Sequence, residues 1–197
     1  MRARIIVFCP VINLSFVLHN KAVFMRQALE LNLKKIAAEA LLREEENFAF
    51  RSFLKGCDPQ ETDEKVHRLN KDISAHIDCT TCGNCCRTFM ISLDNEDIVR
   101  SSAYVDMQPD EFKRKYLEES SEGNYIFSRI PCHFLHENKC TIYEGRPEDC
   151  RSFPHLHKKG FTSRLLSAID HYGICPIVYN VMEALKAETG FRYRTSR

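Results

Sequence analysis

The sequence lacks tryptophan and has no marked excess of charge of either sign. Lys and Arg together number 28 and Asp and Glu 27, so the net charge at pH 7 is +1. This balance excludes a protein held to nucleic acid mainly by charge, because such proteins are strongly basic. Glycine and proline are also scarce, at 7 residues each, which excludes collagen-like and low-complexity chains.

The sequence also lacks the common motifs of nucleotide-binding proteins and hydrolases. It contains no Gly-rich phosphate loop and no G-x-S-x-G nucleophile motif. Apolar residues make up 44% of the chain and charged residues 28%, which is typical of a folded globular protein and argues against wholesale disorder. The 197 residues fit one domain, or one domain with extensions.

Cysteine is the residue type that the chain has in excess. Ten Cys in 197 residues are about 5%, below the roughly 8–10% that marks a small disulfide scaffold. A disulfide framework would also need an oxidising compartment. Dense C-x2-C spacing without a clear export signal favours metal binding instead, so we predict reduced thiols and a cytoplasmic protein.

Eight of the ten cysteines lie downstream of residue 78. They are Cys79, Cys82, Cys85, Cys86, Cys132, Cys140, Cys150 and Cys175. The first three repeat the C-x2-C-x2-C start of ferredoxin-type loops and also contain the paired cysteines of zinc knuckles. We therefore predict all eight as metal ligands, enough for two four-coordinate centres, and the spacing leaves both an iron–sulfur cluster and zinc open.

The adjacent cysteines Cys85 and Cys86 are not expected to bind the same ion. Side chains of neighbouring residues diverge, so Cys85 and Cys86 suit two adjacent metals, or one metal and an auxiliary thiol. The two cysteines outside the group, Cys9 and Cys57, are interpreted as inert buried thiols. Four histidines lie near the cysteines in sequence but are not predicted as ligands, because eight thiolates already fill two centres; they are His133, His155, His157 and His171.

Apolar periodicity predicts a mostly helical, loop-rich α+β fold. Helices are expected at 25–54, 60–77, 95–102, 110–117 and 176–188, with a short helical turn from Pro147 that carries Cys150. Strands are expected at 88–93, 125–130 and 165–169. Asp94, Glu96 and Asp97 are interpreted as capping and first-turn residues of the third helix.

These elements predict a small, metal-stapled cysteine domain at 79–189. A pair of helices at 25–78 precedes it and a basic tail at 190–197 follows it. Residues 1–24 are interpreted as a weak leader or as sequence upstream of a translation start at Met25. No membrane-spanning segment is expected, because the apolar stretch at 5–18 is too short and contains Pro10 and Asn13.

Two sequence blocks resemble the YkgJ-type cysteine-cluster family, described as a zinc- or iron-chelating domain. The first is Cys79-x-x-Cys82-Gly83-x-Cys85-Cys86, followed by Ile91-Ser92-Leu93 and Asp97-Ile98-x-Arg100. The second runs from Pro131-Cys132 through Cys140-x-Ile142-Tyr143-Glu144-x-Arg146-Pro147-x-x-Cys150-Arg151-x-Phe153-Pro154, and Cys175-Pro176 follows. The resemblance covers residues 79–176 and implies metal binding without supplying a substrate.

Three functional hypotheses follow. The first is a metal-binding module whose thiolates chelate iron or zinc and hold a small domain together. The second is an iron–sulfur redox or protein-modifying enzyme, because flagellin lysine N-methylases have a related cysteine arrangement; no methyl-donor domain is visible here. The third is an interaction scaffold that docks a protein partner through its N-terminal helices. Neither nucleic acid nor a membrane is expected as a partner.

Two arginines flank the last cysteine of the second block. Four thiolates around Zn²⁺ leave a net charge of −2, and guanidinium groups could offset it by hydrogen-bonding the sulfurs. Arg146 and Arg151 are the candidates for this role, and the alternative is that they are ordinary surface residues. Ile142 and Tyr143 are expected to pack against the centre and keep water from it.

Overall fold

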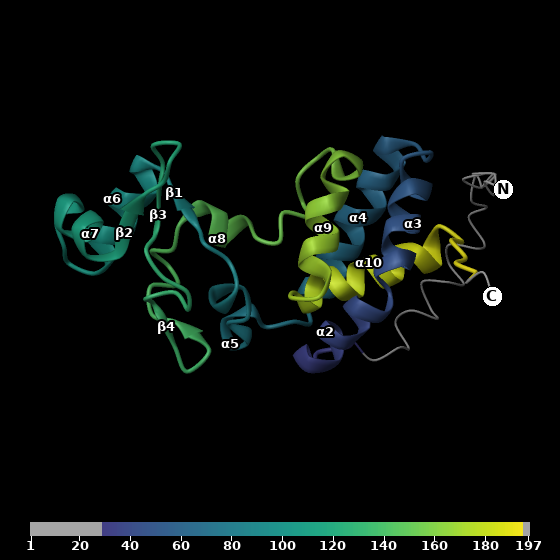
Figure 1. Cartoon of the computed structure of the whole chain (residues 1–197), viewed down its shortest axis with the longest axis horizontal. Coiled ribbons are helices and arrows are strands. Elements are labelled where there is room, and N and C mark those ends of the chain that lie inside the picture. The colour runs from purple at the N-terminus through teal and green to yellow at the C-terminus, as the bar shows by residue number, and fades with distance from the viewer. Residues whose placement is uncertain (1–28, 195–197) are drawn as a thin grey trace. The chain divides into compact units, whose positions relative to one another are not determined.

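The computed structural model describes residues 29–194, which form two compact units. The helical unit combines residues 29–77 with 156–194, and the cysteine unit comprises residues 78–155 (Figure 1). Many helices and a few short strands confirm the predicted helix-rich α+β class. The interpretations of residues 1–24, Cys9 and the end of the tail lie wholly or partly outside the described residues.

The helical unit is built from both ends of the described chain. Its elements are α2 (Leu33–Leu42), α3 (Glu44–Leu54), α4 (Pro59–Ser74), the 3-10 helix η2 (Phe161–Arg164), α9 (Leu165–Tyr172) and α10 (Pro176–Glu188). Asn32 caps α2 by accepting from the backbone N–H groups of Lys34 and Lys35. Asp58 caps α4 in the same way, and Pro59 occupies the first helical position, where no N–H is needed.

Two predictions for this unit were wrong. The single helix expected at 25–54 is divided at Arg43, which leaves helical geometry (φ −107°, ψ 16°). A new helix starts there because three glutamates follow, and negative charge stabilises a helix N-terminus. The strand expected at 165–169 is helix α9, whose buried positions Leu165, Ala168 and Tyr172 follow the helical period; a short apolar run does not distinguish the two.

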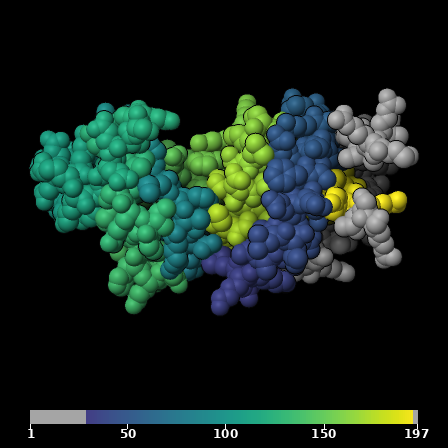
Figure 2. All heavy atoms as spheres, viewed as in Figure 1, coloured from purple at the N-terminus to yellow at the C-terminus, as the bar shows by residue number. Residues whose placement is uncertain are grey.

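Helix α10 lies at the centre of this unit. Ten of its residues between Pro176 and Lys186 are buried, as expected for a helix covered on all sides. It packs against α2, α4 and α9. Figure 2 shows α9, in yellow-green, directly beside the blue residues of the N-terminal helices, far from it in sequence.

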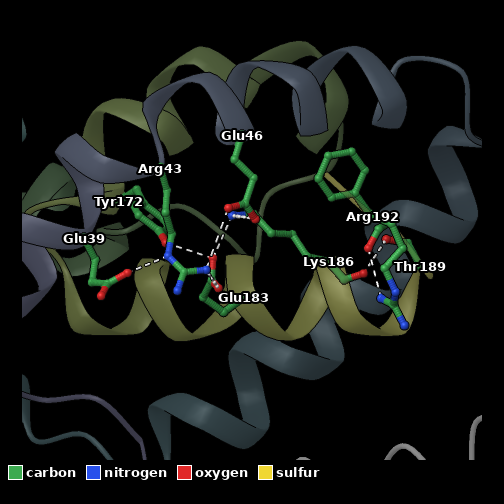
Figure 3. A network of polar contacts seen from close by, with 9 residues as sticks. Glu39, Arg43, Glu46, Tyr172, Glu183, Lys186, Thr189 and Arg192 are labelled. Carbon is green, nitrogen blue, oxygen red and sulfur yellow. Dashed lines mark hydrogen bonds and ion pairs between the residues drawn. The ribbon is translucent and has the colours of Figure 1, made fainter. Parts of the chain in front are cut away.

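A network of charges joins α2 and α3 to α10 (Figure 3). The Lys186 ammonium lies 2.7 Å from a Glu183 carboxylate oxygen and 3.0 Å from one of Glu46. Arg43 binds Glu39 at 2.6 Å and Glu183 at 3.0 Å. The Tyr172 hydroxyl donates to Glu183 at 2.8 Å, and burial together with this carboxylate raises the pKa of Tyr172 far above its usual range.

We expect Lys186→Met to destabilise the protein by about 2 kcal/mol. The side chain of Lys186 is only 7% exposed, and removing its charge leaves Arg43 as the remaining cation beside Glu46 and Glu183. A fully buried broken pair costs about 3–5 kcal/mol, and the partly exposed glutamates reduce that cost. Urea unfolding measures it, with Lys34→Met as the exposed control; equal midpoints for the two variants would contradict this prediction.

The cysteine unit contains short elements joined by loops. They are α5 (Cys79–Cys82), the 3-10 helix η1 (Cys85–Arg87), β1 (Ser92–Leu93), α6 (Asn95–Tyr104), α7 (Pro109–Tyr116), β2 (Leu117–Glu119), β3 (Tyr125–Phe127), β4 (Leu135–His136), β5 (Lys139–Cys140) and α8 (Glu148–Ser152). Strands β1 and β2 pair with opposite edges of β3, both antiparallel, and β4 pairs with β5 in a hairpin. The strands expected at 88–93 and 125–130 are present but shorter.

One apolar core supports the cysteine unit. Its buried members are Leu93, Ile98, Phe112, Leu117, Phe127, Phe134 and Ile142. Phe134 is the hub of its aromatic contacts, stacked on Phe112 with ring centroids 5.9 Å apart and edge-on to Phe127 at 5.7 Å. Cys132 and Cys140 pack against the outside of this core, so the apolar cluster fixes the backbone on which two candidate ligands stand.

The compact units do not follow the expected boundary at residue 189. Residues 156–189 belong to the helical unit, because α9 and α10 bury their apolar faces against α2, α3 and α4. Cys175 therefore lies in the helical unit, as the buried residue that precedes α10. Over residues 29–194, no helix combines the length and apolar character needed to cross a bilayer.

Candidate metal centre

The first four cysteines lie on two short helical turns joined by a left-handed residue. Asp78 begins α5 by accepting from the Thr80 backbone N–H at 2.8 Å. Gly83 then takes φ +61°, a conformation that glycine adopts without steric cost. The chain turns there into η1, so Cys79 and Cys82 lie on one turn and Cys85 and Cys86 on the next.

This segment packs against the β4–β5 hairpin. Glu137 and Asn138 both have positive φ, as a two-residue type I′ turn requires. At Gly83 an added Cβ would lie 2.9 Å from the Asn138 carbonyl oxygen, so the two backbones are in close contact. Nearby, the Cys132 N–H donates to the Cys86 carbonyl at 2.8 Å. These contacts bring cysteines from separate blocks of sequence together.

Four thiols influence one another electrostatically, and we call Cys86, Cys132, Cys140 and Cys150 the thiol tetrad. Burial raises the pKa of Cys150 well above its usual range, and the other three thiols raise it further. Burial raises the pKa of Cys132 to about 11, with added effects from Cys86 and Cys140. Burial also raises the pKa of Cys140, to which Cys86 contributes. Such mutual effects require the groups to lie close together.

Backbone N–H groups orient two members of the tetrad. The N–H of Phe134 donates to the Cys132 sulfur and that of Ile142 donates to the Cys140 sulfur, and each bond lowers the pKa of the thiol that accepts it. Both donors come from the residue two positions after the cysteine, and both donor residues are buried in the apolar core. Donors of this kind favour the thiolate, the form that binds metals.

Cys86 is the member of the tetrad most easily ionised near neutral pH. Its sulfur lies 4.0 Å from that of Cys85. This hydrogen bond lowers the pKa of Cys86 to about 7 against the opposing effect of burial, and the nearby Arg87 charge adds to the lowering. The two adjacent sulfurs are therefore close enough to affect each other's ionisation.

Arg146 and Arg151, the two arginines predicted to offset the thiolate charge, have different surroundings. Arg146 lies over the Tyr143 ring, with its guanidinium carbon 3.5 Å from the ring centroid. Its charge lowers the pKa of Cys79, Cys140 and Cys150 against the larger effect of burial. Arg151 instead donates to the carbonyl oxygens of Glu144 and Arg146. Of these two arginines, Arg146 is the one near the thiols, and Arg151 braces the turn that carries it.

Cys79 and Cys82 form a second group in the same unit. Burial raises the pKa of Cys79, with contributions from Cys82 and Asp78. Helix α5, which carries both cysteines, contacts β5, so this group borders the tetrad at Cys140. No disulfide joins the cysteines found within residues 29–194.

The tetrad fits a metal ion by its donor chemistry. Within the part of the chain that the structure describes, no three Cys, His, Asp or Glu side chains already stand at metal-binding geometry. Burial holds the pKa of Cys132 and Cys150 above the usual range, and a protonated thiol is not a ligand. Binding an ion requires the thiols to lose their protons and draw together. Four thiolates suit both zinc and iron.

The remaining candidates either have other partners in the cysteine unit or belong to the helical unit. Cys57 is buried beside the end of α3 in the helical unit, as predicted for an inert thiol. His133 hydrogen-bonds the Ser128 hydroxyl at 2.9 Å, and burial lowers the pKa of its ring. His171 lies on α9 in the helical unit.

The sequence interpretation missed the role of Asp97. Asp94 does cap α6, accepting from the Asp97 N–H at 2.8 Å. Asp97, however, is 4% exposed, and its carboxylate accepts from the Glu148 N–H at the start of α8. The signal available in the sequence was its place beside Arg100 in the first family block.

The comparisons with known proteins gave a match to one family model. No solved structure matches the chain. Residues 78–168 match the family model CxxCxxCC, described as a "putative zinc- or iron-chelating domain". The match includes the four cysteines of the first block and Cys132, Cys140 and Cys150, and it ends before Cys175. Both cysteine blocks thus lie within residues that match this family model, as their resemblance to the family indicated.

Proposed function

We propose that the cysteine unit chelates a zinc or iron ion through the thiolates of the tetrad: Cys86, Cys132, Cys140 and Cys150. The observation that supports this most is the proximity of these four thiols, which come from four separate segments. The Cys132 N–H donates to the Cys86 carbonyl at 2.8 Å, Cys132 and Cys140 pack on one apolar core, and the four thiols affect one another's pKa. Once bound, the ion would cross-link those segments covalently in a unit of very short strands. Metal affinity then contributes directly to folding.

Charge compensation supports the same assignment. Four thiolates around a divalent ion carry a net charge of −2, which is costly in a half-buried site unless cations lie near. Arg146 faces Cys140 and Cys150, and Arg87 faces Cys86. Neither arginine forms an ion pair with a carboxylate within the described ranges, so both charges are available to the centre.

Cys79, Cys82 and Cys85 are proposed as thiolate ligands of a second, neighbouring ion. Cys79 lies near Cys82, and the sulfur of Cys85 is 4.0 Å from that of Cys86. Adjacent cysteines suit two neighbouring ions because their side chains diverge. Cys175, which lies in the helical unit and beyond the matched residues, stays a prediction from the sequence.

The test is metal content in cysteine variants of the full chain. We expect the wild type, purified anaerobically, to carry zinc or iron, and Cys150→Ser to lose tetrad affinity by more than about 100-fold, the upper range for altering an outer-shell partner. Cys82→Ser should lower the metal-to-protein ratio while the tetrad ion is retained. Visible absorption together with acid-labile sulfide would identify an iron–sulfur cluster instead of a single ion.

The control is Cys57→Ser, which removes a buried thiol from the helical unit and should leave metal content unchanged. Full metal content in Cys150→Ser and Cys132→Ser would contradict the proposed ligand set.

A further inference from the structure

Helix α6 holds the backbone of the turn between Cys140 and Cys150. The Asp97 carboxylate accepts from the Glu148 N–H at 2.8 Å and forms an ion pair with Arg100. One turn along the helix, the Ser101 hydroxyl donates to the Gly145 carbonyl at 2.8 Å, and Ser101 is fully buried.

The two segments are also in tight steric contact. A Cβ atom added at Gly145 would lie 2.5 Å from the Tyr104 Cβ, so only glycine allows the turn to approach α6 this closely. The guanidinium of Arg100 reaches the Arg146 carbonyl at 3.4 Å. Contacts from Asp97 to Tyr104 thus fix residues 145–148 along more than two turns of the helix.

These contacts determine where the turn can lie. A buried carboxylate is costly without donors, and the first N–H groups of a helix have no partner within it. The Glu148 N–H at the start of α8 therefore gains an acceptor, and the Asp97 carboxylate gains a donor. Sliding the turn would break the bond from the Glu148 N–H and leave Asp97 with Arg100 as its partner. Cys150 lies only two residues beyond Glu148.

We propose that Asp97 and Ser101 are positioning residues for the metal centre, which set the 145–148 turn so that the Cys150 thiol and the Arg146 guanidinium face the other thiols. The inference rests on the proposed function. It goes beyond that function because it gives a role to α6, a helix that carries no ligand. This helix would set the positions of the ligand Cys150 and of the compensating charge of Arg146.

The experiment uses the full chain with Zn²⁺ competition titration and the Co²⁺–thiolate absorption spectrum. We expect Asp97→Ala to weaken Zn²⁺ binding by about tenfold or more, as loss of an outer-shell partner does, and to alter the Co²⁺ spectrum. Asp97→Asn should restore most of both, because the amide oxygen still accepts from the Glu148 N–H. Ser101→Ala, which removes a single hydrogen bond, should give a smaller loss in the same direction.

The matched control is Glu96→Ala, which removes an exposed carboxylate from the same turn and should behave as wild type. A merely structural role would lower the unfolding midpoint without altering the Co²⁺ spectrum. If Asp97→Ala fails to fold, the Ser101→Ala variant alone tests the proposal. Wild-type Zn²⁺ affinity and spectrum in both folded variants, or in Ser101→Ala alone when only it folds, would overturn the proposal.

Alkylation of the protein as purified, with no chelator added, separates this inference from the proposed function. Iodoacetamide labelling followed by mass spectrometry should show Cys150 reacting several-fold faster in Ser101→Ala than in wild type, with Cys57 as the internal reference. An unchanged rate would overturn the positioning role. If the wild type binds no metal, the proposed function fails, whatever the labelling shows.

Discussion

Removing the ion proposed for the cysteine unit is expected to unfold residues 78–155 and leave the helical unit folded. The cysteine unit has strands of two or three residues and one small apolar core, so little holds it together without the ion. Structural zinc contributes about 10–16 kcal/mol of apparent binding free energy in small domains. The helical unit has its own core around α10.

Hydrogen exchange with mass spectrometry, with and without a chelator, measures this directly. Peptides from residues 79–150 should lose protection by orders of magnitude, while those of α4 and α10 keep theirs. Re-addition of Zn²⁺ should restore the protection. Undiminished protection of the cysteine unit after verified loss of all metal would contradict a structural role for the ion.

The second large effect is expected for Gly83→Ala. Its φ of +61° disfavours any side chain, at a cost of about 1–2 kcal/mol. The added methyl group would also lie 2.9 Å from both the Asn138 carbonyl oxygen and the Leu135 side chain. Because a backbone atom cannot easily move aside, the first cysteine block should separate from the hairpin. We expect a total loss of about 3 kcal/mol together with weaker metal binding.

Gly123→Ala is the matched control, because it separates backbone strain from the steric clash. Gly123 also has a positive φ, of +78°, but no atom lies within 4 Å of its added Cβ. It should therefore lose only the conformational cost and keep its metal. Thermal melts and metal analysis of both variants test this; equal losses in the two would show that the contact at Gly83 is unimportant.

Local signals predicted several elements closely. The helix expected at 176–188 is α10, because Pro176 occupies its first position and an apolar run follows. The helix expected at 95–102 is α6, two residues longer, because Asp94 caps it as predicted. Caps and prolines act within a few residues of themselves, so sequence alone reveals them.

Contacts between residues far apart in the chain could not be predicted from these local signals. The break at Arg43 coincides with its ion pairs to Glu39 and Glu183, the latter far along the chain. The return of residues 156–194 to the N-terminal helices depends on which apolar faces meet in space. The packing of one apolar face on another leaves no local pattern in the sequence. The end of the cysteine unit therefore could not be predicted from sequence.

The candidate site, too, could be predicted from the sequence only in part. Spacing was enough to predict a thiol cluster at 79–86, because four cysteines within eight residues have few other uses. The grouping of Cys86 with three cysteines of the second block depends on the Cys132–Cys86 backbone bond and the hairpin. The part played by α6 depends on a buried carboxylate that resembled an ordinary helix-start residue.

X-ray absorption at the metal edge of the anaerobically purified protein tests the central claim most directly. Thiolate ligation by the tetrad predicts a first shell of sulfur at about 2.3 Å from zinc, with a coordination number near four that falls in Cys150→Ser. A first shell of nitrogen or oxygen, or the absence of any stoichiometric metal, would contradict the account.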